Sequence, residues 1–158
     1  MKMRMKMKNK SILAIALVML FCACGSDKGY KAGDFYDEGG VEAVVVTADS
    51  TGVATMLMSV AEAKDIDADS AKLWASSLGE GWTLPTSEEM NLLYRNRSYI
   101  NETLEGKKLP TLFGLNTYYW TSTPCSESHV NARGPDGIKC YLASGHSACY
   151  RARAVKKL

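Results

Sequence analysis

No apolar run in this sequence of 158 residues is long enough to cross a membrane. The run from Ile12 to Ala23 falls short of the about 20 residues that a membrane-spanning helix needs. It follows a head with five basic and no acidic residues: Lys2, Arg4, Lys6, Lys8 and Lys10. A basic head and a short apolar core are the layout of a secretory signal, so we expect residues 1–23 to be removed.

An excess of basic charge is missing from the rest of the chain. Residues 1–23 carry five of the 19 Lys and Arg and none of the 17 Asp and Glu. The remainder therefore has 14 basic against 17 acidic residues, a net charge of −3. Nucleic-acid binding needs a basic surface, so we expect no nucleic acid as a partner. About 135 residues are enough for one domain with one core.

The segment LFCACG, residues 20–25, predicts a lipid anchor. It resembles a bacterial lipobox, in which the signal is cut before a cysteine that is acylated, here Cys24. Cys22 is a poorer candidate because a bulky residue precedes it, and a plain cleaved signal with an incidental Cys24 is the alternative. The two residues after Cys24 lack the aspartate that retains some lipoproteins in the inner membrane. We therefore expect an outer-membrane lipoprotein, and Asp27 is compatible with display on the cell surface.

The chain then divides into a tether, residues 24–33, and a domain, residues 34–158. The tether is small, polar and Gly-rich. Residues 34–40 predict a turn-rich opening of the domain. Two β-branched runs, Val41–Thr47 and Val53–Val60, flank a turn over residues 49–52 and predict a hairpin.

The next segment has a helical period. The apolar residues Ala71, Trp74, Ala75 and Leu78 recur at i, i+3, i+4 and i+7, which predicts one face of a helix. Asp69 or Ser70 can cap its start, and Gly79 can take the left-handed conformation that ends it.

The segment GWTLPTSEEM, residues 81–90, predicts a second helix and not a catalytic site. Thr86 stands at the N-cap position, and Glu89 can bond back to its N–H group, which makes a capping box. Adjacent carboxylates on a helix point about 100° apart, so Glu88 and Glu89 cannot face each other across a substrate. We expect Trp82 and Trp120 in the core, because large rings bury the most area there.

Further along, we expect a short helix over Tyr99–Leu104, an aromatic strand over residues 117–123 and a polar loop over residues 124–137. The last segment, residues 138–155, predicts a hairpin that turns near Ser144 and Gly145.

Three blocks in this order resemble a known family. They are Gly81–Glu89, Tyr119–Thr123 and Arg151–Val155. They are similar to the Gly-Trp-Arg-Leu-Pro-Thr-x-x-Glu, Tyr-Trp-Ser-Ser-Thr and Val-Arg-Ala-Val blocks of the C-terminal domain of Legionella collagen-like protein and of the related Fibrobacter succinogenes major paralogous domain. Residues 33–46 and 57–63 also resemble the start of these domains in lipoproteins of Bacteroides-like organisms.

This resemblance implies a C-type-lectin-like α+β fold, with two helices packed on small twisted antiparallel sheets and with long loops. It implies no enzyme activity. Thr83 stands where the family has arginine. The sequence also lacks the Glu-Pro-Asn, Gln-Pro-Asp and Trp-Asn-Asp triplets that bind calcium and sugar in true C-type lectins. Calcium-dependent sugar binding is therefore not expected.

Three cysteines and two histidines gather in the last third: Cys125, His129, Cys140, His146 and Cys149. They can in principle form a zinc site, but the paired Cys-x-x-Cys spacing is missing, and cysteines outside the cytoplasm more often form disulfides. We expect no cofactor and one disulfide, with Cys140–Cys149 as the first candidate, and no bond at all is the alternative. Strand alternation sets those two on different faces, so Cys125–Cys149 is the alternative. A Cys125–His nucleophile lacks an orienting group.

Together these features predict a lipid-anchored, non-catalytic protein of the cell envelope that binds a glycan, a peptide or a partner protein. The candidate ligand loop is residues 124–137, with Glu127, His129, Asn131, Arg133 and Asp136 as its hydrogen-bonding side chains. An ordinary solvated loop is the alternative for this segment. For the whole protein, the alternatives are a structural or assembly component of a surface complex and, less favoured, a zinc-binding protein.

Overall fold

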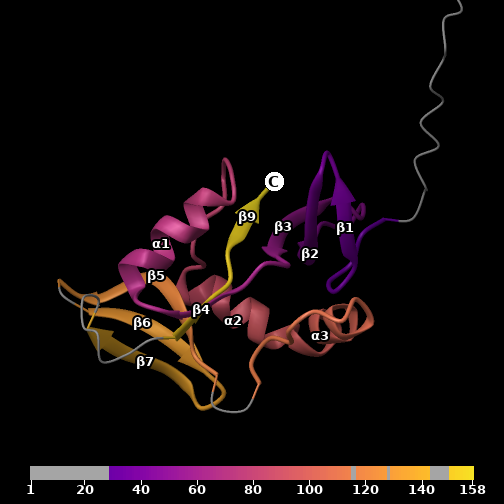
Figure 1. Cartoon of the computed structure of the whole chain (residues 1–158). Helices are drawn as coiled ribbons and strands as arrows, with labels where there is room; N and C mark the ends of the chain where they lie inside the picture. The colour runs from indigo at the N-terminus through magenta and orange to yellow at the C-terminus, as the bar shows by residue number, and fades with distance from the viewer. Residues whose placement is uncertain (1–28, 115–116, 128, 143–149) are drawn as a thin grey trace, which may run out of the picture.

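The computed structural model describes residues 29–114, 117–127, 129–142 and 150–158. It shows an α+β fold with three helices and two small sheets (Figure 1). In chain order the elements are β1 (Phe35–Glu38), β2 (Val41–Ala48), β3 (Ala54–Ser59), β4 (Ala63–Ile66), α1 (Ala68–Ser77), α2 (Ser87–Arg95), α3 (Arg97–Gly106), β5 (Tyr119–Ser126), β6 (His129–Gly134), β7 (Gly137–Leu142), β8 (Tyr150–Ala152) and β9 (Val155–Lys157).

The beginning of the described chain lies against the domain. Tyr30 N donates a hydrogen bond to Gly52 O (2.7 Å), and Gly33 N donates to Val45 O (2.8 Å). Residues 29–33 of the predicted tether are thus bonded to β2 and to the turn that follows it. The predicted signal peptide and the predicted acylation site, Cys24, lie outside the described residues.

The first sheet has the strand order β1-β2-β3-β9. Its centre is the hairpin of β2 and β3, which confirms the prediction. Asp49 holds the turn, because its Oδ1 accepts hydrogen bonds from the N–H groups of Thr51 (2.8 Å) and Val53 (3.0 Å). β9 brings the C-terminal segment to the other side of β3.

The turn-rich opening predicted for residues 34–40 is wrong in part, because Phe35–Glu38 form β1. Only Gly39 and Gly40 form the turn, with φ values of 60° and 77°. Two successive positive φ values match the right-handed twist of a two-residue hairpin, and glycine adopts them without strain.

The helices number three among the described residues, where the resemblance implied two. α1 is capped by Asp67, so the predicted caps Asp69 and Ser70 are wrong. Asp67 Oδ1 instead accepts hydrogen bonds from the N–H groups of Asp69 (3.0 Å) and Ser70 (2.9 Å). A cap needs an extended backbone, which Asp67 has with ψ 168°. Gly79 has the predicted positive φ, 124°.

The second helix, α2, confirms the capping box. Glu89 N donates to Thr86 Oγ1 (3.1 Å), and Thr86 N donates to Glu89 Oε2 (2.8 Å). α3 begins directly after α2 and extends beyond the predicted helix Tyr99–Leu104 at both ends.

The second sheet, with the order β4-β8-β5-β6-β7, departs most from the prediction. The predicted polar loop over residues 124–137 is wrong, because much of it forms the end of β5 and the whole of β6. The predicted terminal hairpin is also wrong, since β7 and β8 are not neighbours. β7 pairs with β6, and β8 lies between β4 and β5, parallel to β5.

Two clusters of buried side chains make up the core. Alternate residues of β2 enter different clusters, Ala43 and Val45 one and Val44 and Val46 the other, so the first sheet lies between them. The first cluster includes α1 and both predicted tryptophans, and the second includes α2 and α3. Trp82 is 7% exposed and Trp120 is fully buried, which confirms their predicted core position.

Candidate functional site

The five predicted ligand residues do not share one loop. His129, Asn131 and Arg133 lie at alternate positions of β6 and therefore on one face of the second sheet, while Val130 and Ala132 are buried on the other. Glu127 is exposed before β6, and Asp136 is exposed in the turn after it. Three of the five predicted residues thus lie on one face of β6, and the other two lie beyond its two ends.

Asn131 holds α2 against the second sheet. Its Nδ2 donates to Ser87 Oγ (3.3 Å), and Ser87 N donates to Thr123 Oγ1 (2.8 Å). Thr121 Oγ1 donates to the carbonyl of Asn131 (2.9 Å). These bonds fasten the start of α2 to β5 and β6, so the Asn131 amide serves the fold.

Asp136 is neutralised by its neighbours. Lys139 Nζ lies 2.5 Å from Asp136 Oδ2, and the Tyr118 hydroxyl donates to the other carboxylate oxygen. The hydrogen bond from Lys139, followed by the one from Tyr118, lowers the pKa of Asp136. Lys139 also donates to the Tyr118 hydroxyl (2.9 Å), so the three groups form a closed set at the β6–β7 turn.

Neither Glu127 nor Arg133 forms an ion pair with a described residue, but Arg133 contacts an aromatic ring. Its Cζ lies 4.2 Å from the centroid of the Tyr94 ring, in the range of a cation–π contact. No described group accepts a hydrogen bond from its guanidinium, and its Nε is buried. The Tyr94 ring is itself fixed by an edge contact with Phe113, at 5.2 Å and 72°.

Arg97 contacts the same ring. Its Cζ is also 4.2 Å from the Tyr94 centroid, and its Nη1 donates to the Tyr94 carbonyl (2.9 Å). We call Tyr94, Arg97 and Arg133 the arginine–tyrosine cluster. The two guanidinium carbons lie at most twice 4.2 Å, about 8.4 Å, apart. Two like charges at that separation repel by about 0.5 kcal/mol in water and by about 2 kcal/mol in a less polar setting.

A second charged group is buried and was missed from the sequence. Glu62, with a side chain 2% exposed, accepts a hydrogen bond from the Tyr119 hydroxyl (2.6 Å) and lies 3.7 Å from Arg153 Nε and 3.3 Å from Arg151 Nη1. Arg153 is fully buried, and burial lowers its pKa. Burial likewise raises the pKa of Tyr119.

Arg153 uses its donors on the backbone. Nη1 donates to the carbonyls of Ser59 (3.0 Å) and Val60 (2.7 Å), and Nη2 donates to that of Pro110 (2.5 Å). These carbonyls come from the end of β3 and from the segment after α3. The group therefore links these segments, and the bonds use three of the five N–H groups of Arg153. Because the side chain is fully buried, its remaining N–H groups cannot reach a ligand in solvent.

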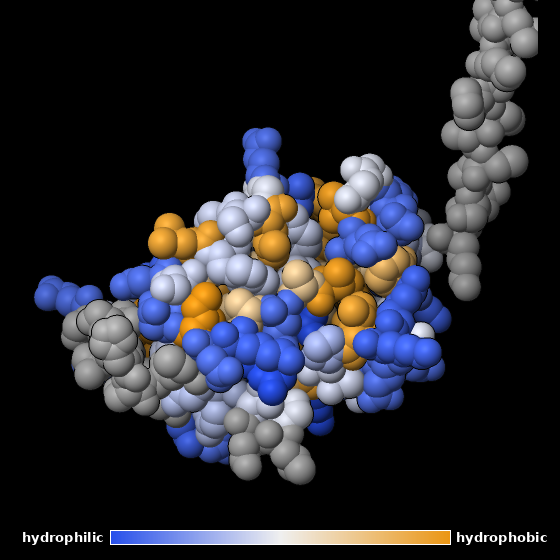
Figure 2. Space-filling model, viewed as in Figure 1, coloured by the Kyte–Doolittle hydropathy of each residue, from blue (hydrophilic) through white to orange (hydrophobic). Residues whose placement is uncertain are grey.

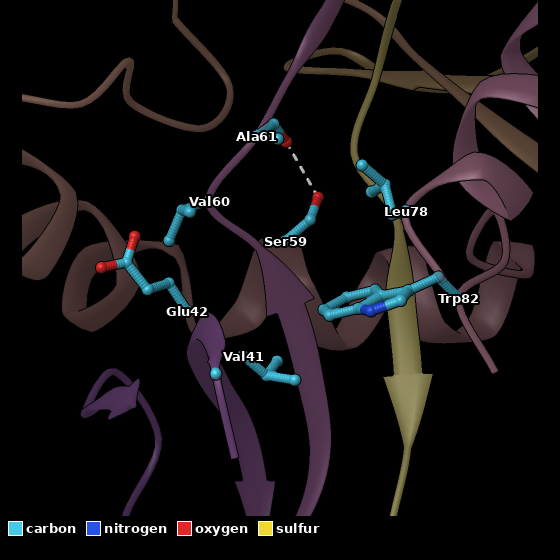
Figure 3. A pocket seen from close by; sticks show the side chains of 8 residues that line it. Val41, Glu42, Ser59, Val60, Ala61, Leu78 and Trp82 are labelled. Carbon is cyan, nitrogen blue, oxygen red and sulfur yellow. Dashed lines mark hydrogen bonds between the residues drawn. The ribbon is translucent and has the colours of Figure 1, made fainter. Parts of the chain in front are cut away.

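Trp82 lines a hollow of about 160 Å³ near the turn between β1 and β2. Figure 3 shows its indole ring beside Ser59, with Val41 and Val60 nearby and the Glu42 carboxylate turned away from the ring. The Ser59 hydroxyl donates to the Ala61 carbonyl (2.8 Å) and so is in use. Ligand pockets are typically about 300–1,000 Å³, so this hollow is small for a binding site.

A larger hollow of about 520 Å³ lies between α2 and the first sheet. Its two opposite charges satisfy each other, because Lys157 Nζ lies 2.7 Å from Glu89 Oε1. The other carboxylate oxygen of Glu89, Oε2, accepts the capping-box hydrogen bond from Thr86 N. Both oxygens of Glu89 therefore have a partner inside the fold.

Cys125 is disulfide-bonded, so its sulfur is neither a thiolate ligand nor a nucleophile in this state. The Cys140–Cys149 and Cys125–Cys149 pairings both include side chains outside the described residues, as does His146 of the zinc hypothesis. The hairpin that favoured Cys140–Cys149 is absent, because β7 and β8 are not paired. Within the described ranges, no three His, Cys, Asp or Glu side chains gather as metal ligands.

No helix in the described part of the chain is long and apolar enough to span a membrane. No protein-family model matches the sequence, and no curated protein matches it. The chemistry of the described side chains therefore has to carry any functional conclusion.

Proposed function

We propose that this chain is a lipid-anchored, non-catalytic binding module of the cell envelope, built on a C-type-lectin-like domain. The signal layout of residues 1–23 and the lipobox-like sequence at Cys24 support secretion and anchoring in the outer membrane. An α+β architecture of helices on two small sheets is compatible with that domain type. The ligand is a glycan, a peptide or a protein.

The observation that carries the proposal is the unused guanidinium of Arg133. Other polar groups that could have formed a site are engaged inside the fold, as Asn131, Glu89 and Arg153 show. Arg133 Nε is buried and has no partner, whereas the two Nη atoms are not buried, donate to no described residue and can reach a ligand. A cation held on a fixed ring, with no hydrogen-bond acceptor or anion among the described residues, favours an external partner, so we propose the arginine–tyrosine cluster as the binding site.

An assembly component is the second candidate, and it requires a broad apolar patch. On the face seen in Figure 2, hydrophobic residues are interrupted by hydrophilic ones. The large exposed hydrophobic residues of the described chain are scattered over the turn after β2, α1, α3, β7 and the C-terminus: Val53, Leu73, Tyr99, Ile138 and Leu158. The visible face thus gives the assembly role no specific support.

An array of defined glycans and peptides tests the proposal. Full-length protein in detergent micelles is compared with the variants R133Q and R95Q. Arg95 is exposed and has no ring contact or ion pair with any described residue, so it is a matched control. We expect the wild-type protein and R95Q to bind the same array members, and R133Q to lose this binding. Signals that survive in R133Q would place the binding site elsewhere.

A further inference from the structure

We propose that the arginine–tyrosine cluster binds one compact oxyanion, a carboxylate or a sulfate, carried by an acidic glycan. This inference rests on the proposed binding function and names its ligand class. It uses three facts about the described residues: the cluster leaves N–H donors unused, no counter-ion lies beside it, and the Tyr94 hydroxyl has no hydrogen-bond partner.

The free donors suit an oxyanion. A guanidinium presents five N–H groups in a planar fork that matches two oxygens of one anionic group. Arg133 donates to no described residue, and Arg97 uses one nitrogen on the Tyr94 carbonyl (2.9 Å). Contact with one ring restricts both side chains before binding, so less side-chain freedom is lost when a ligand binds.

The described residues supply no counter-ion to this cluster. The ion pairs among the described residues engage other cations, namely Lys64, Lys72, Lys139, Arg151, Arg153 and Lys157. Arg97 and Arg133 therefore repel each other without compensation inside the described chain. An anion beside the ring would relieve that repulsion and could accept charge-assisted hydrogen bonds from N–H groups that the cluster leaves free.

Three observations favour a glycan as the carrier. The hydroxyl of Tyr94 has no hydrogen-bond partner among the described residues, and sugar acids carry hydroxyl groups next to their anionic group, which aspartate and glutamate side chains do not. Recognition of an anionic membrane surface typically uses clusters of four to eight basic residues, and this cluster has two. The net charge of −3 for residues 24–158 opposes binding to nucleic acid.

The test is a titration of the full chain in neutral detergent micelles, followed by calorimetry. The probes are a hyaluronan hexasaccharide (carboxylate), a heparin hexasaccharide (carboxylate and sulfate), neutral maltohexaose and a hexaglutamate peptide. We expect both acidic glycans to bind, and R97Q and R133Q each to weaken them by about tenfold or more. R95Q should change the affinity by less than about twofold. Raising the salt concentration should weaken binding because it screens the charges.

The outcomes separate this inference from the broader proposal. Maltohexaose that binds as well as the acidic glycans, with loss in R133Q, would refute the anion inference and keep the binding site. Equal losses in R95Q and R133Q would show unspecific attraction and refute the inference, as would binding of hexaglutamate alone. If no probe binds, the anion inference fails, and the array with R133Q still decides the broader proposal. Unchanged melting temperatures of the variants exclude misfolding as the cause of a loss.

Discussion

Replacing Arg153 by methionine should destabilise the domain far more than the same change at Arg151. The two arginines lie two residues apart and both approach Glu62, at 3.7 Å and 3.3 Å. They differ in burial, since the Arg153 side chain is fully buried and that of Arg151 is 36% exposed. Both variants remove one positive charge beside Glu62. A difference in their stability therefore measures the effect of burial and of the backbone hydrogen bonds.

The magnitude follows from what methionine leaves behind. It fills much of the space of Arg153, but the carbonyls of Ser59, Val60 and Pro110 lose their donor, and Glu62 loses a buried cation. Removing one member of a buried charged group costs about 3–5 kcal/mol. Arg151 is partly exposed, and without it the buried Glu62 keeps Tyr119 and Arg153 as partners, so we expect R151M to cost about 1 kcal/mol.

Thermal and urea unfolding, followed by circular dichroism, measure the difference. Domains of this size have a total stability of about 5–15 kcal/mol, so R153M should lose a large part of it. We expect the melting temperature to fall by roughly 10–20 °C in R153M and by less than about 4 °C in R151M. Equal and small losses would show that the buried group does not hold the fold. The double variant E62Q/R153M should lose less than the sum of the two single variants, because each alone leaves a partner unpaired.

Three further predictions concern the caps and the cysteines. T86A should cost about 1 kcal/mol in urea unfolding, because it removes the acceptor of the α2 capping box. Burial raises the pKa of Glu89, but hydrogen bonds from Lys157 and Thr86 outweigh it and hold the pKa below 4.5. The stabilisation by Glu89 is therefore present above pH 4.5 and lost as the pH falls through the folded pKa, so the advantage of wild type over E89Q should shrink in unfolding curves below pH 4.5. Peptide mapping should find Cys125 joined to Cys149. The other partner, Cys140, lies in β7, and β6 stands between β7 and β5, which carries Cys125. Two strand spacings are about 9.5 Å, which is beyond the reach of a disulfide.

Each of these has a contrary result. S50A is the control for T86A, because Ser50 is exposed in a turn and its side chain forms no hydrogen bond with a described residue. Equal losses in the two variants would refute the role of the cap. If the difference in unfolding free energy between wild type and E89Q does not change with pH, the charge of Glu89 does not stabilise the domain. A Cys125–Cys140 peptide would contradict the strand order of the second sheet.

Local signals made α2 and the first hairpin predictable from sequence. The capping box Thr86–Glu89 and the turn at Asp49 are set by residues within four positions of each other, and their geometry does not depend on the rest of the fold. Asp67 was also local and was overlooked, since an aspartate stands two residues before the predicted cap Asp69. The choice among Asp67, Asp69 and Ser70 depended on which of them has an extended backbone, and the sequence does not show this.

The strand pairing of the second sheet could not be predicted from such local signals. β6 does alternate between polar and apolar residues, but its polar members and the nearby prolines and glycines favoured a loop. β8 pairs in parallel with β5, about 30 residues earlier, and no local signal indicates that contact. Strand alternation would set Arg153 on the face opposite Ala152 and Ala154, yet all three residues are fully buried because both sides of this segment are covered.

The same limit applies to the candidate site. Arg133 was named as one hydrogen-bonding residue among five, and its partners Tyr94 and Arg97 come from the end of α2 and the start of α3. A spacing of about 36 residues separates them from Arg133. Only the packing of α2 on the second sheet brings the three together, so the sequence suggested the residue but not the cluster.

Hydrogen-exchange mass spectrometry of the full chain, with and without the heparin hexasaccharide, tests the central claim most directly. If the arginine–tyrosine cluster is the binding site, protection should rise in peptides covering residues 92–98 and 130–134 and stay unchanged around Trp82. Protection centred on the hollow at Trp82, or spread evenly over the surface, would contradict the proposed site.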